Sequence, residues 1–190
     1  MICSWNDVAL VALENAESLE DIAQVLVATL TEARVQYGQV ELLCGPLSGT
    51  TRGDVVQNRA VLEAAAHLYG NMDRKTIFTL APVLEFQNDF FLSDNVGEGA
   101  LPTSLYLRAL DIACVHTLLC IPGYDGAIEV EAAKRFAVKK GIVVSVSTDK
   151  NFPQALQLSL QGGYSSYPIY RQHPIVRPPH VDLPEVRQPA

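Results

Sequence analysis

Four short runs of apolar residues, without alternating polar side chains, lie between Val40 and Ser147. The runs are rich in Val, Ile and Leu, which is the pattern of strands covered on both faces of a sheet. We therefore predict four buried strands, at Val40–Cys44, Thr76–Ala81, Thr117–Ile121 and Ile142–Ser147.

Amphipathic stretches around these runs predict helices. The stretch "SLEDIAQVLVATLTEARVQYG" begins at Ser18, a typical N-cap, and ends at Gly38, a typical C-terminal stop. Further helices are predicted at Asp54–Tyr69, closed by Gly70, at Leu105–Val115, at Ala127–Lys140, closed by Gly141, and at Pro153–Leu160. Strands that alternate with helices indicate an α/β fold with a doubly wound parallel sheet, a Rossmann- or flavodoxin-like three-layer sandwich.

Two stretches show neither the pattern of a helix nor that of a strand. Ala81 to Pro102, which contains "EFQNDFFLSDNVGEGALP", is predicted to be a long loop, and such loops are commonly lids or binding loops. Six of the 11 prolines follow Gly163, which predicts an extended tail. The expected organisation is a single α/β domain over residues 1–163, with a Pro-rich C-terminal tail over residues 164–190.

Composition narrows the classes of function. The 190 residues are 48% hydrophobic, which suits one domain with a sizeable core, and the net charge of −7 with no dense run of Lys and Arg argues against a nucleic-acid partner. No apolar stretch approaches the roughly 18 residues that span a bilayer, and the first residues lack the pattern of a signal peptide. The four cysteines are far apart, with no C-x-x-C and no zinc spacing. We expect a cytoplasmic protein that needs no metal or other cofactor.

The loop "CGPLSGTTRGD" directly follows the first predicted strand. Gly45 and Gly49 permit tight turns, while Ser48 and Arg52 are among several possible hydrogen-bond donors. A Gly-rich turn after the first strand can hold an anion on its backbone N–H groups, although a plain strand-to-helix turn is the alternative. Neither the dinucleotide fingerprint nor the P-loop motif is present.

The second loop with possible chemistry lies in "LLCIPGYDGAIEVEAAKRF", where a strand ends at a Pro-Gly pair and a helix begins. Because the carboxyl ends of parallel strands meet at one edge of a sheet, this loop is expected to share a crevice with the first. Val130 and Ala133 would form the buried stripe of the helix and leave Glu129 near the crevice, whereas Glu131 suits solvent. The alternative is that Glu129 is a surface acid stabilised by the helix dipole.

Together these motifs resemble a known family. "GPLSG" at Gly45–Gly49, Asn58 and "IPGYDGAIE" at Ile121–Glu129 are similar, in order and spacing, to motifs of the nucleoside 2-deoxyribosyltransferase-like superfamily, closest to its short bacterial and phage branch. The resemblance covers about Val40 to Val144. It implies cleavage or transfer at the N-glycosidic bond of a nucleoside or nucleoside 5′-monophosphate through a Glu nucleophile and a glycosyl-enzyme ester. It also implies a homo-oligomer.

The resemblance assigns roles to individual residues. Glu129 would be the nucleophile and Asp125 would contact the sugar or base. Asp111 is the nearest candidate for a further acid, although counting back from Pro122 puts Arg108 or His116 at the expected positions. The implied substrate-binding residues are Gly45, Pro46, Leu47, Ser48, Gly49, Asn58, Gly123, Tyr124 and Gly126.

Departures from the family pattern leave alternatives open. The spacing from Gly126 to Glu129 is one residue shorter than the usual G-x-x-x-E, so Glu131 is an alternative equivalent, and an inactive site is another. A non-catalytic protein of the same fold that binds a nucleotide or sugar phosphate is the alternative function. "PGYDGAIEVEAA" is also similar to the P-G-G-x-G-T-x-x-E block of cytokinin-activating phosphoribohydrolases, but it lacks the second glycine and the Thr.

Overall fold

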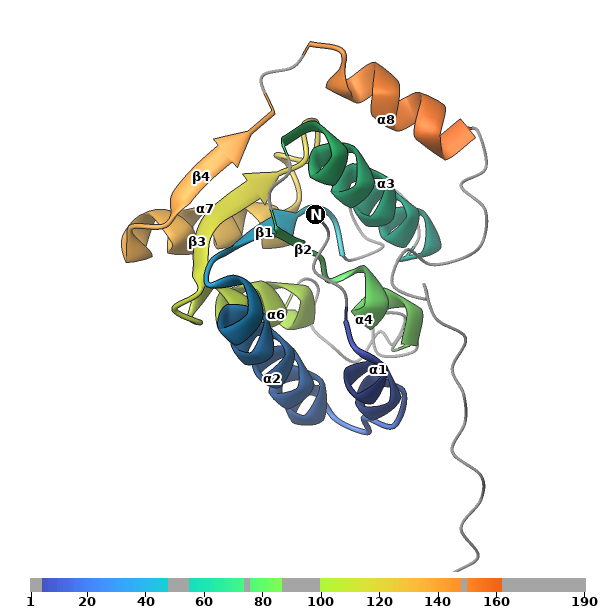
Figure 1. Cartoon of the computed structure of the whole chain (residues 1–190). Helices are drawn as coiled ribbons and strands as arrows, with labels where there is room; N and C mark the ends of the chain where they lie inside the picture. The colour runs from blue at the N-terminus through green and yellow to red at the C-terminus, as the bar shows by residue number, and fades with distance from the viewer. Residues whose placement is uncertain (1–4, 48–54, 74–75, 87–99, 148–149, 162–190) are drawn as a thin grey trace, which may run out of the picture.

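A computed structural model describes residues 5–47, 55–73, 76–86, 100–147 and 150–161 of the chain. A parallel sheet of four strands in the order β2-β1-β3-β4 forms its centre (Figure 1). The strands are β1 (Val40–Cys44), β2 (Ile77–Phe78), β3 (Val115–Cys120) and β4 (Val143–Val146). This topology confirms the predicted doubly wound α/β fold.

Helices cover both faces of the sheet, as the reversal of strand order at β1 requires for right-handed crossovers. On one face, α6 (Ala100–Leu110) packs between α2 (Leu19–Tyr37) and α7 (Ile128–Lys140), and on the other α3 (Val55–Asp73) packs against α8 (Phe152–Gln161) (Figure 1). Two short helices, α1 (Asp7–Glu14) and α4 (Ala81–Phe86), contact each other, and they pack against α2 and α3 respectively.

Local signals set the ends of the best-predicted helices. Ser18 caps α2, where its side chain accepts a hydrogen bond from the Asp21 N–H, and Gly38 follows the last turn with a φ of 78°. Gly141 ends α7 in the left-handed conformation, with a φ of 73°, which suits a residue without a Cβ. The predictions for these two helices are confirmed to within one or two residues.

The prediction of a loop from Ala81 to Pro102 is wrong at both of its ends. Residues 81–86 form α4, whose Pro82 lies in the first turn, where a missing N–H costs nothing. The Thr79 hydroxyl accepts a hydrogen bond from the Ala81 N–H at the start of this helix, at 3.2 Å. Pro102 likewise lies in the first turn of α6, which begins at residue 100 and ends at residue 110, five residues before the predicted end.

Three further features differ from the sequence predictions. Helix α3 continues to Asp73 rather than stopping at Gly70, and α1 was not predicted. Strand β4 is an edge strand in which Val143 is 61% exposed and Val146 is 41% exposed, so it is not covered on both faces. The predicted tail over residues 164–190 and the middle of the predicted loop, residues 87–99, lie outside the described residues.

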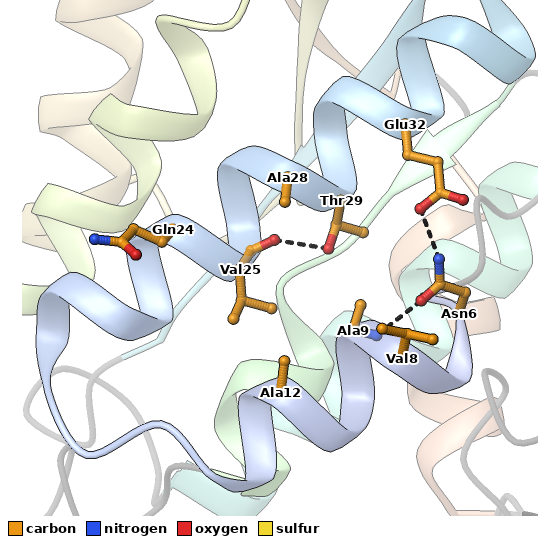
Figure 2. Close-up of a pocket in the computed structure, with 9 residues that line it drawn as sticks. All are labelled: Asn6, Val8, Ala9, Ala12, Gln24, Val25, Ala28, Thr29 and Glu32. Carbon is orange, nitrogen blue, oxygen red and sulfur yellow. Dashed lines mark hydrogen bonds between the residues drawn. The ribbon is translucent and has the colours of Figure 1, made fainter.

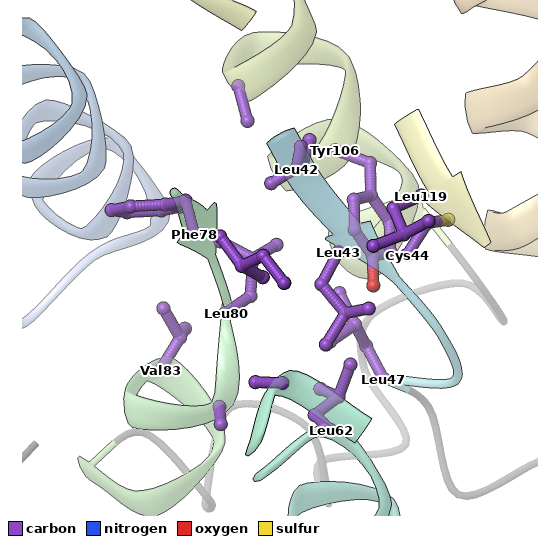
Figure 3. Close-up of a cluster of buried hydrophobic side chains, with 14 of the residues drawn as sticks. Leu42, Leu43, Cys44, Leu47, Leu62, Phe78, Leu80, Val83, Tyr106 and Leu119 are labelled. Atoms are coloured by element: carbon purple, nitrogen blue, oxygen red, sulfur yellow. The ribbon is translucent and has the colours of Figure 1, made fainter. Parts of the chain in front are cut away.

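The core is continuous across the sheet. Leucines of β1 pack with Phe78, Leu80 and Val83 from the region of β2 and α4 (Figure 3). Trp5 stacks on Phe78 with ring centroids 5.3 Å apart and donates its indole N–H to the Thr79 carbonyl at 3.0 Å. These contacts join the region before α1 to the β2 edge of the sheet.

Cys44, Cys114 and Cys120 are buried free thiols. Among the described helices, none combines the length and the apolar character that crossing a bilayer requires.

Candidate active site

The carboxyl ends of β1 and β3 lie side by side, as predicted for the two loops that follow them. Cys44 pairs with Cys120 in the sheet register, and the Ile121 N–H continues the ladder by donating to the Cys44 carbonyl at 2.9 Å. We call this place, with the turn Gly45–Leu47 and the first turn of α7, the carboxyl edge of the sheet. The opposite ends of the same strands form the amino edge.

Glu129 is buried at the carboxyl edge and contacts the first loop. Only 1% of the residue is exposed, and its Oε1 accepts a hydrogen bond from the Leu47 N–H at 3.0 Å. Val130 and Ala133 form the buried stripe of α7, as expected. The alternative of a solvent-exposed surface acid at position 129 is therefore wrong, and the two motifs meet in one place.

Tyr106 is part of this edge and was not predicted from the sequence. Its fully buried hydroxyl accepts a hydrogen bond from the Gly45 N–H and donates one to the Gly45 carbonyl, both at 2.9 Å. Figure 3 shows the side chain beside Cys44 at the end of β1. In sequence, Tyr106 is one of several apolar or aromatic positions of a helix, so no local signal marked it.

Burial keeps two neutral groups at this edge in their protonated forms. Removal from water raises the pKa of Tyr106 well above its usual value, and the nearby Cys44 and Glu129 act in the same direction. Burial and the hydrogen bond with Cys120 also raise the pKa of the Cys44 thiol. At pH 7 the Tyr106 hydroxyl is consequently a neutral group that can both donate and accept.

Gly45 lies in a closely packed place. A Cβ at this position would lie 2.7 Å from Cδ1 of Ile121 and 3.1 Å from Cδ2 of Leu62, distances at which a neighbour must move. The next two residues, Pro46 and Leu47, are buried as well. The turn is thus held between α3, β3 and α6, and its backbone reaches Glu129 in a fixed conformation.

The loop between β3 and α7 is held by one lysine. Lys134 forms ion pairs with Asp125 and with Glu131, the latter at 3.2 Å. Burial lowers the pKa of Lys134, but its bonds to these two carboxylates outweigh that effect and raise it. Asp125 is mostly exposed, and its carboxylate pairs with Lys134.

Glycine and tyrosine complete that loop. Gly123 has a φ of 88°, a conformation that a residue with a Cβ adopts at a cost, whereas Gly126 has open space around its Cα. Tyr124 is half-buried and packs against the core. Both glycines and Tyr124 lie in the segment that leads from β3 to Glu129.

Asp111 does not belong to the carboxyl edge. It follows α6 and pairs with Lys140 at the last turn of α7, whereas Glu129 lies in the first turn of that helix. His116 also lies toward the amino edge, with its Nδ1 3.1 Å from the Val40 carbonyl, and Arg108 pairs with Glu20 of α2. The structure therefore places none of these three candidates for the further acid near Glu129.

The remaining candidate residues fall on α3 and on the first loop. Asn58 lies in the first turns of α3 and is 1% exposed. Its position on a helix that packs against β1 agrees with a place near the carboxyl edge. Ser48 and Gly49 lie outside the described residues.

A groove of about 290 Å³ lies elsewhere, between α1 and α2 (Figure 2). Small and apolar residues such as Ala12, Val25 and Ala28 line it, and the Asn6 amide donates to Glu32 at one end, at 2.6 Å. None of the predicted site residues lines this groove. In the part of the chain that the structure describes, no group of three or more His, Cys, Asp or Glu side chains could hold a metal ion.

Comparison with known proteins does not assign the carboxyl edge to a family. No family model matches the chain, and neither the curated proteins nor the solved structures contain a match.

Proposed function

We propose that this chain cleaves or transfers at the N-glycosidic bond of a nucleoside or nucleoside 5′-monophosphate, with Glu129 as the nucleophile. The observation that supports this function is the hydrogen bond from the Leu47 N–H to Glu129 Oε1. It joins the G-P-L-S-G turn to the acid of the P-G-Y-D-G-A-I-E segment, which are the two motifs that the family resemblance pairs.

The surroundings of Glu129 suit a carboxylate nucleophile. A main-chain amide orients the side chain, and the N-terminus of α7 favours its negative charge. In the proposed reaction a carboxylate oxygen bonds to C1′ of the sugar, and the bond from C1′ to the base breaks with its electron pair leaving on the base, which takes up a proton. Water, or a second base, then takes the sugar from the ester and restores the carboxylate.

A substitution that keeps the shape of the side chain tests this role. Glu129→Gln retains an oxygen that can accept from the Leu47 N–H but removes the charge and the nucleophile. The purified chain is incubated with a panel of nucleosides and 5′-monophosphates, and free base is followed by chromatography. We expect Glu129→Gln to reduce base release at least about a thousandfold.

Glu131→Gln is the matched control, because Glu131 lies on the same helix and pairs with Lys134. We expect it to change base release by less than about threefold. Mass spectrometry of the acid-quenched wild type should also find the chain heavier by one sugar, and Glu129→Gln should not carry this adduct. A wild type that is as silent as Glu129→Gln on the whole panel would contradict the enzymatic proposal, and loss in Glu131→Gln alone would move the nucleophile to Glu131.

A second candidate is a protein that binds a nucleotide or sugar phosphate without converting it. This candidate is favoured by the positions of the two other acids that the resemblance assigns to the active site. Asp111 lies toward the amino edge, and Asp125 pairs with Lys134. A ligand at about 100 times its Kd stabilises the folded state by roughly 2.7 kcal/mol, which a thermal unfolding experiment detects. Stabilisation without base release supports this candidate, and the absence of both contradicts the two proposals together.

A further inference from the structure

We propose that Tyr106 is a positioning residue for Glu129, because its hydroxyl fixes the Gly45 peptide and, through the turn to Leu47, the amide that binds the Glu129 carboxylate. The position of Tyr106 is 23 residues before Glu129 in sequence, on a different helix. The catalytic consequence of this inference rests on the proposed function, whereas the structural relation between the two side chains does not.

The first step is the double contact at Gly45. One hydroxyl satisfies both the N–H and the carbonyl of the same residue, each at 2.9 Å. Tyr106 is fully buried, so water cannot replace the hydroxyl without opening the core. This contact holds the chain where it leaves β1.

The second step is the short and stiff path from Gly45 to Leu47. Only Pro46 lies between them, and its ring restricts φ to about −65°. The side chains of Ile121 and Leu62 lie so close to Gly45 that an added Cβ would be 2.7 Å and 3.1 Å from their terminal methyl groups, so the turn lies in a packed environment. A change in the orientation of the Gly45 peptide is therefore transmitted to the Leu47 N–H.

The third step is the carboxyl group itself. The Leu47 N–H lies 3.0 Å from Glu129 Oε1, and a hydrogen bond weakens steeply when the donor turns away from the acceptor. Tyr106 does not need to touch a substrate for this effect, since it acts through the amide. Loss of its hydroxyl should loosen the carboxylate while the fold persists.

Tyr69 provides a matched control at the same edge. It is also a buried tyrosine on a helix, and its hydroxyl donates to the carbonyl of Cys120 at the end of β3, at 3.2 Å. Its ring stacks on Phe152, with centroids 4.4 Å apart, on the α3 side of the sheet. Tyr69→Phe removes a buried hydroxyl near the carboxyl edge but leaves the Gly45 peptide in place.

The experiment compares Tyr106→Phe, Tyr69→Phe and wild type by NMR of the full chain. The reference is Glu129→Gln, in which the Leu47 amide signal must move because its acceptor loses its charge. We expect Tyr106→Phe to shift the Leu47 signal as well and to raise its hydrogen-exchange rate at least about tenfold. Tyr69→Phe should leave the exchange rate of Leu47 within about twofold of wild type.

Steady-state kinetics then separate the inference from the proposed function. We expect Tyr106→Phe to lower kcat about tenfold or more with KM within about twofold, because positioning matters most in the transition state. An unchanged Leu47 amide in Tyr106→Phe, or an equal change in both tyrosine variants, would overturn the positioning role. A changed amide in a chain whose wild type releases no base would leave the positioning of Glu129 intact and refute the N-glycosidase proposal.

A measurement on the wild type keeps the inference testable if Tyr106→Phe does not fold. The Gly45 and Leu47 amides should exchange with the same dependence on urea concentration, because one opening event breaks both contacts. Different dependences at these two amides would show independent openings and would overturn the proposal.

Discussion

Two acidic side chains, Glu129 at the carboxyl edge of the sheet and Asp111 at the amino edge, are held in opposite ways. At the carboxyl edge, Glu129 is buried and bonded to a main-chain amide, and Tyr106 braces the turn that carries that amide. At the amino edge, the acidic side chain of Asp111 is 61% exposed and pairs with Lys140, another surface group. Both acids were candidates for the same site from the sequence, yet only one has the desolvated and oriented environment that catalytic carboxylates require.

The difference also shows which kind of contact carries information about function. Surface ion pairs form wherever opposite charges lie within reach, and they contribute little to the free energy of unfolding. Burial of a carboxylate destabilises the folded state unless hydrogen-bond donors replace the lost water, so a buried carboxylate requires an explanation. The carboxyl edge is therefore the place where substitutions should have large effects.

The largest effect on stability should come from removing the buried acid. We expect Glu129→Ala to lower the free energy of unfolding by about 2–3 kcal/mol, because the Leu47 N–H loses its acceptor in a buried place and a cavity remains. Asp111→Ala, at the amino edge, should lower it by less than about 0.5 kcal/mol. Urea unfolding of the two variants and wild type measures both changes. Equal losses of unfolding free energy in the two variants would contradict the proposed difference between Glu129 and Asp111.

A smaller but sharper effect is expected from the packing of Gly45. Gly45→Ala places a Cβ against Cδ1 of Ile121 and should lower the free energy of unfolding by about 1–2 kcal/mol. Ile121→Val removes that methyl group, so the double variant should recover about 1 kcal/mol of the loss expected from adding the two single changes. Urea unfolding of the four chains gives this coupling energy. Additive effects would show that the clash is relieved elsewhere and that the carboxyl edge is less tightly packed than the distances indicate.

Much of this architecture follows from local patterns. The apolar runs predicted the strands of the sheet, and Ser18 and Gly38 marked α2 because capping is a local interaction. The meeting of Gly45 and Glu129 was also predictable, since parallel strands place their carboxyl ends at one edge. The sequence thus predicted the fold and the central pair of the candidate site.

Other features depend on contacts that no local pattern contains. Tyr106 reaches Gly45 from 61 residues away, and an aromatic residue in a helix otherwise indicates only a core position. Asp111 looked plausible because chain order places it before β3, but the strand carries the chain from the amino edge to the carboxyl edge after that residue. The sequence does not predict the short helix α4, because six residues are too few to show a helical period within the stretch from Ala81 to Pro102.

The smallest effect should come from the surface pair between Arg108 and Glu20, which tests the exposed side of the comparison. The hydrogen bond and the charge of Arg108 lower the pKa of Glu20 below 4.5. A carboxyl group whose pKa is lowered in the folded state increases the free energy of unfolding at pH values above its pKa in the unfolded chain. This contribution is lost as the pH falls through the pKa of the folded state. We expect Arg108→Gln to lower Tm by about 1 °C or less at pH 7, and the difference from wild type should shrink as the pH falls through the lowered pKa of Glu20 and the carboxylate is protonated. Arg135→Gln is the control for the change in net charge, since among the described residues the Arg135 Nε donates within its own helix, to the Glu131 carbonyl at 3.4 Å. A pH-independent difference in Arg108→Gln would mean that the arginine acts through packing of its stem rather than through Glu20.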